Sequence, residues 1–116
     1  MIVRLLPALL LALPAFGHPA TIEGADAERS GDGWRVSVTL SHEETGWDDY
    51  ADGWRVEAED GTVLGVRELL HPHVDEQPFT RSLGGAAVPE GTGTVWIRAR
   101  TKTTGWGEER LEVPLE

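Results

Sequence analysis

Apolar and polar residues alternate in short runs along most of the chain, and this period of two predicts β-strands with one buried face. The clearest run begins at Trp34 and ends at Leu40, with Arg, Ser or Thr at every second position. Strands are expected at residues 20–27, 34–40, 54–58, 62–69, 79–83, 95–100 and 111–115. No segment shows sustained helical periodicity, although residues 43–51 fit one helical turn.

Glycine and proline separate these runs and mark the expected turns. The chain has 14 Gly and 7 Pro among 116 residues. In Glu59-Asp60-Gly61, glycine stands where a tight hairpin turn requires a positive φ. About seven short strands with regularly spaced turns predict a single all-β domain, an immunoglobulin-like antiparallel β-sandwich.

The N-terminus has the features of a secretory signal. A short basic start ending at Arg4 precedes the apolar residues 5–13, and small residues follow up to Gly17. Cleavage after Gly17 leaves a domain of residues 18–116, located in the periplasm or secreted. The apolar run is far shorter than the roughly 20 residues that a membrane-spanning helix needs, so no membrane insertion is expected after signal removal. A membrane-anchored product is the alternative.

Composition excludes several functions. The formal net charge of −10, from 20 acidic and 10 basic residues, argues against binding to nucleic acid. There is no cysteine, so the exported domain is stabilised by its core without disulfides. The chain also lacks a cysteine nucleophile and the strained turn that exposes a hydrolase serine. We therefore expect a monomeric binding protein and no enzyme.

Two resemblances support export and the sandwich. The strings TGWDDYADGWRV (residues 45–56) and HPHVDEQPFTRSL (residues 71–83) resemble a group of small exported bacterial proteins. That resemblance implies export and carries no activity with it. Residues 88–99 are similar to the entry into the sixth strand of fibronectin-type and related immunoglobulin-like sandwiches.

Strand directions predict where the histidines gather. In an antiparallel sandwich successive loops alternate between the two ends, which places the N-terminus and loops 41–52, 71–78 and 102–107 at one end. His18, His42, His71 and His73 all belong to these segments.

The chemistry that this end predicts is transition-metal binding. Pro72 keeps His71 extended, so the two flanking histidines lie on one side, roughly 6.6 Å apart along the chain. A mature N-terminal His18 offers its α-amine and its ring to Cu(II), the preferred ion, with Zn(II) second. The set resembles the histidine-brace arrangement of secreted copper proteins, and His42 completes the candidate ligands.

A metal-free alternative uses the aromatic side chains of the same end. Trp47, Tyr50 and Trp106 could stack on the sugars of a glycan or bind an envelope protein. The histidines would then be ordinary solvated loop residues. The acidic residues 48–52 lack the ligand spacing of known calcium loops, so a solvated or capping role is expected for them.

Overall fold

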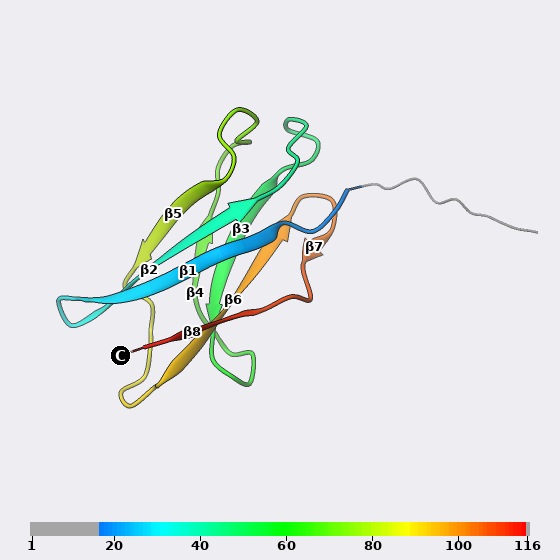
Figure 1. The fold of residues 1–116 in the computed structure, drawn as a ribbon. Coiled ribbons are helices and arrows are strands. Elements are labelled where there is room, and N and C mark those ends of the chain that lie inside the picture. Colours follow the sequence, from blue (N-terminus) through cyan, green and yellow to red (C-terminus); the bar gives the residue numbers. More distant parts are fainter. Residues whose placement is uncertain (1–16, 116) are drawn as a thin grey trace, which may run out of the picture.

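The computed structural model describes residues 17–115 and shows an all-β fold (Figure 1). All but the last residue of the predicted signal lies outside the described residues. Strands joined by loops and turns make up residues 17–115, and no helix occurs among them. The strands are β1 (Thr21–Ser30), β2 (Gly33–Ser41), β3 (Ala51–Glu57), β4 (Val63–Glu68), β5 (Phe79–Gly84), β6 (Thr94–Thr101), β7 (Gly105–Trp106) and β8 (Leu111–Pro114).

The strands form two antiparallel sheets that face each other. One sheet has the order β1-β2-β5, and the other has the order β4-β3-β6-β7 with β8 also paired to β6. Strands β7 and β8 occupy different stretches of the same neighbour: Trp106 pairs with Arg100, whereas Leu111 pairs with Ile97. The result is a two-layer arrangement of the sandwich type.

The core lies between the sheets and is built from the side chains that alternate inward. On β2, Trp34, Val36, Val38 and Leu40 are all buried. Trp54 on β3 and Ile97 on β6 are fully buried opposite them. These are the faces that the period of two predicts.

The predicted strands are present with shifted bounds, and the structure adds one. The two-residue β7 lies where a loop was expected, because Trp106 and Gly105 pair with the end of β6. The predicted helical turn at 43–51 is wrong. That segment contains a bridge between Gly46 and Asp49, with Gly46 at a φ of 134°. Gly61 has the predicted positive φ, at 93°.

The loops divide between two ends of the molecule. Figure 1 shows the β2–β3 and β4–β5 loops together at one end, where the described chain also begins. The backbone carbonyl of His18 contacts the ring of His42, and Glu44 contacts His73, so these segments meet. The three segments form what we call the histidine end.

Within residues 17–115, no helix is long and apolar enough to cross a membrane.

Candidate functional site

A buried carboxylate, Glu44, organises the histidine end. Its side chain has no exposed surface. One oxygen accepts the backbone N–H of Ala51 at 2.7 Å, and the other accepts the backbone N–H of His73 at 2.8 Å. Glu44 also accepts a hydrogen bond of 2.7 Å from Nδ1 of His42. One side chain thereby joins the end of β2, the start of β3 and the β4–β5 loop.

Both ring nitrogens of His42 face acceptors. Nδ1 lies 2.7 Å from the Glu44 carboxylate, and Nε2 lies 2.9 Å from the backbone carbonyl oxygen of His18. The ring is thereby held from both sides, by a carboxylate out of contact with water and by a backbone carbonyl. Asp49 adds a second carboxylate oxygen 3.8 Å from Nε2. His42 therefore has a structural role: its ring connects the N-terminal segment to the Glu44 carboxylate.

His71 and His73 lie beside each other on the β4–β5 loop, with ring centroids 4.8 Å apart. The buried ring of His73 stacks on Phe79 at 4.0 Å, whereas His71 is exposed. Burial lowers the pKa of His73, and the charges of Arg81 and His71 lower it further. His73 is accordingly neutral at neutral pH.

The predicted four-histidine metal centre is not formed. Among the described residues 17–115, no three His, Asp or Glu side chains are grouped to hold a metal ion. His42 has no ring nitrogen left to ligate, and only the backbone carbonyl of His18 is seen to contact it. Copper or zinc binding by the remaining pair, His71 and His73, stays a prediction.

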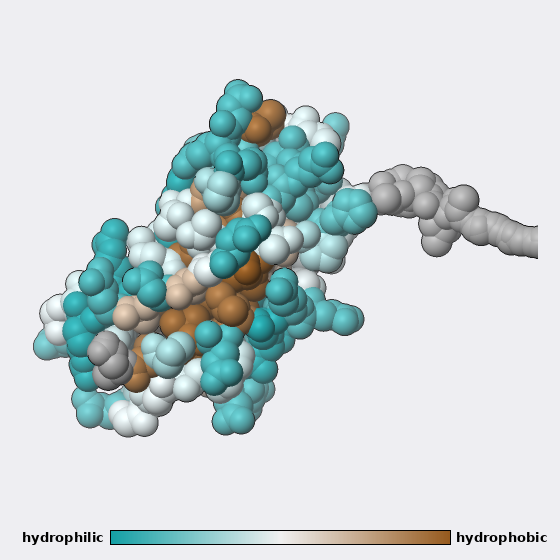
Figure 2. Space-filling view, viewed as in Figure 1, coloured by the Kyte–Doolittle hydropathy of each residue, from teal (hydrophilic) through white to brown (hydrophobic). Residues whose placement is uncertain are grey.

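A groove opens between the two loops that Glu44 joins. Its volume is about 540 Å³. The lining residues are Gly46, Trp47, His71, Pro72, His73, Val74, Asp75 and Glu76. Trp47 is 63% exposed and meets the buried ring of Tyr50 edge-on, with centroids 5.6 Å apart. Figure 2 shows a hydrophobic spot at the tip of the β4–β5 loop, in an otherwise hydrophilic end.

Of the three aromatic residues predicted to act together, Trp47 and Tyr50 are in contact, whereas Trp106 lies elsewhere. Trp47 is exposed, and Tyr50 is buried beneath it. Trp106 lies on the outer face of the five-stranded sheet, with the guanidinium groups of Arg55 and Arg100 at 4.1 and 4.9 Å from its ring centroid. Only Trp47 remains as a binding platform at the groove.

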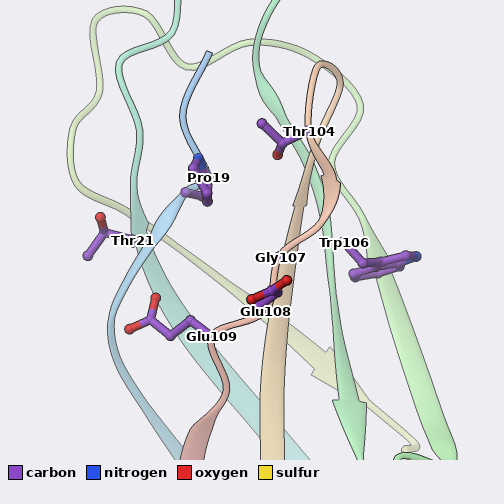
Figure 3. Close-up of a pocket in the computed structure, with 8 residues that line it drawn as sticks. Pro19, Thr21, Thr104, Trp106, Gly107, Glu108 and Glu109 are labelled. Carbon is purple, nitrogen blue, oxygen red and sulfur yellow. The ribbon is translucent and has the colours of Figure 1, made fainter. Parts of the chain in front are cut away.

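A second hollow of about 550 Å³ lies between the N-terminal segment and the β7–β8 connection. Figure 3 shows Glu108 and Glu109 on its rim, with the Trp106 indole across β7 from Pro19. Its lining contains no histidine and no basic side chain. It also lacks an exposed aromatic platform such as Trp47.

A buried acid that the hydrophobic pattern does not reveal, Glu57, lies on the outer face of the five-stranded sheet. Its fully buried carboxylate lies 2.7 Å from Nε of Arg55, 2.8 Å from Nε of Arg98 and 3.2 Å from Nε of Arg110. Burial alone would raise the pKa of Glu57, but hydrogen bonds from Arg98 and Arg55 outweigh it and lower the pKa. Opposite charges at outward positions of neighbouring strands are the signal that could have revealed this network.

Comparisons with known proteins give one informative relative. No protein-family model matches the sequence, and no solved structure matches it. A protein of Halomicrobium mukohataei named "Putative lipoprotein" is 49% identical over 80 residues. The match covers 69% of this chain and 39% of the relative, so the chain spans less than half of that protein's length.

Proposed function

We propose that this chain is an exported binding module of the cell envelope, with an immunoglobulin-like sandwich that presents the groove at the histidine end to a glycan. The apolar N-terminal segment and the lipoprotein name of the relative support export. The strand order, β1-β2-β5 against β4-β3-β6-β7, supports the immunoglobulin-like assignment. The proposal assigns no catalytic step.

The observation that carries the proposal is the exposed indole of Trp47 on a braced turn. A large aromatic side chain that is 63% exposed gains free energy when a flat apolar surface covers it. The ring is supported from below by Tyr50, and the turn is tied through Ala51 to Glu44. A platform held in place before binding loses little conformational entropy when a ligand arrives.

The rest of the groove matches the polar edge of a sugar. Asp75 and Glu76 offer carboxylate oxygens that accept hydrogen bonds from hydroxyl groups. Pro72 and Val74 add apolar contact beside them, with Val74 53% exposed. Alternating apolar and acceptor surface in an open groove suits an extended glycan.

A glycan array with the exported protein tests the proposal. The wild type is expected to retain glycans, and Trp47→Ala to weaken binding at least about tenfold, roughly 1.4 kcal/mol at 25 °C. Val63→Ala is the control, because Val63 is exposed on β4 and does not line the groove. Retention of no glycan by the wild type, or equal binding by Trp47→Ala, would overturn the proposal.

The metal hypothesis gives a different result in the same assay. If Cu(II) or Zn(II) held by His71 and His73 formed part of the site, a chelator would abolish retention. The glycan proposal expects retention that is unchanged by chelator, because Trp47 and the two carboxylates contact the ligand directly.

A further inference from the structure

A small pocket adjoins the groove. Basic side chains line it, although the protein as a whole is acidic. It has a volume of about 110 Å³. It is lined by Arg67, Leu69, Leu70, His71, His73 and Arg81. Two arginines and two histidines therefore gather in a chain of net charge −10. We call this space the cationic pocket; His71 and His73 line both it and the groove.

Two buried polar atoms of this lining have no partner among the described residues. They are Nε of Arg67 and Nδ1 of His73. Arg67 forms no ion pair within residues 17–115, and its NH1 group donates to the backbone carbonyl of Glu68. A buried guanidinium N–H without an acceptor is costly, and its position in the wall of a pocket allows an oxygen of a bound ligand or of water to accept from it.

The charges around the pocket leave a positive surplus at Arg67. Arg81 is neutralised by Glu76, with 3.0 Å between NH2 and Oε1. Glu44 lies behind His73, 3.8 Å from Nδ1, and is already engaged by His42. Trp54, the register partner of Arg67 on β3, is uncharged. The lowered pKa of His73 agrees with a positive electrostatic potential in the pocket. Burial is the largest cause of the lower pKa, and the charges of Arg81 and His71 lower it further.

We propose that the cationic pocket binds an oxyanion, a carboxylate, sulfate or phosphate group, with Arg67 as its principal contact. The pocket has space for one such group and a bridging water, which occupies about 30 Å³ in the liquid. Because two histidines line both spaces, a ligand lying along the groove can insert an acidic substituent. The ligand class is then an acidic glycan. The glycan assignment rests on the proposed function, whereas the oxyanion site does not depend on that function.

Sodium sulfate tests the oxyanion site alone. Titrated at constant ionic strength, it is expected to give saturable NMR shifts centred on the amides of residues 67, 71, 73 and 81. Arg67→Gln should weaken binding at least about tenfold. Arg35→Gln, at an exposed arginine of β2 that does not line the pocket, is the control and should leave it unchanged. Arg67→Lys keeps the charge without the Nε donor and should bind with intermediate affinity.

Two results would overturn the oxyanion site. One is sulfate-induced shifts that spread equally over the other arginines. The other is unchanged binding by a folded Arg67→Gln protein. If Arg67→Gln does not fold, the Arg67→Lys isotherm decides, since wild-type affinity there would show that the Nε donor makes no contact.

A matched pair of oligosaccharides tests the acidic glycan. An oligogalacturonate and its neutral galactose counterpart are each titrated into the wild type, Trp47→Ala and Arg67→Gln. Trp47→Ala should weaken both sugars, and Arg67→Gln should weaken only the acidic one. Sulfate binding with no binding of either sugar would retain the pocket and reject the proposed function. Binding of both sugars with equal loss in Arg67→Gln would reject the acidic glycan as the ligand class and retain the groove.

Discussion

Removal of the Glu44 carboxylate is the most informative perturbation of this fold, because three segments depend on it. Glu44→Ala leaves the backbone N–H groups of Ala51 and His73 without their acceptor. Each buried donor left unsatisfied costs about 1–3 kcal/mol. The substitution also removes the carboxylate that contacts Nδ1 of the buried His42 ring.

The expected loss from the two donors is about 2–6 kcal/mol, a large share of the roughly 5–15 kcal/mol that a domain has in total. Glu44→Gln keeps one carbonyl oxygen as an acceptor and should therefore lose only about half as much. Glu43→Ala is the control, because Glu43 is the exposed neighbour.

Urea unfolding at pH 7, followed by tryptophan fluorescence, measures these free energies of unfolding. Hydrogen exchange adds a local readout, and the amides of Ala51 and His73 should exchange faster in Glu44→Gln than in the wild type. A loss below about 1 kcal/mol in Glu44→Ala would refute the argument, since it would leave even one orphaned donor unaccounted for.

Three further outcomes are expected from the same structure. Because burial, and then Arg81 and His71, lower the pKa of His73 from 6.5, the unfolded chain binds the proton more readily. Stability should therefore fall as the pH drops below 6.5, and His73→Phe should flatten this slope in urea titrations at stepped pH. Glu57→Gln should lose about 3–5 kcal/mol at pH 7, because the paired arginines keep their charge. Since the pKa of Glu57 is lowered from 4.5, its contribution is present above that pH and lost as the pH falls through the folded value, so unfolding at pH 3 should show a smaller difference. Stoichiometric Cu(II) should broaden the NMR signals of His71 before those of His42, and the reverse order would show that His42 has a free nitrogen.

Side-chain alternation carried most of the fold prediction. An inward residue at every second position follows from backbone geometry alone, so Trp34 and Ile97 could be assigned to the core without a structure. The two-residue β7 has no room for alternation and escaped prediction. The gathering of the histidines followed from strand directions, which need only the order of the elements.

The roles of the histidines could not be predicted in the same way. His42 is engaged by the Glu44 carboxylate and by the carbonyl of residue 18, and a backbone acceptor leaves no mark in the sequence. Trp106 was assigned to the loop end because the sequence does not show that Arg55 and Arg100 cover it. Glu57 shows the same limit. An acidic residue is expected to be exposed to solvent unless the positions of the arginines that surround it in the fold are known.

The divided edge beside β6 has a consequence for behaviour at high concentration. An uninterrupted edge strand exposes a row of unpaired backbone groups on which other copies can polymerise. Here that edge consists of β7 and β8, which are two and four residues long, and β8 ends at Pro114, which has no N–H to donate. Neither fragment is long enough to template the addition of a foreign strand. The protein should therefore resist fibril formation along this side even when crowded.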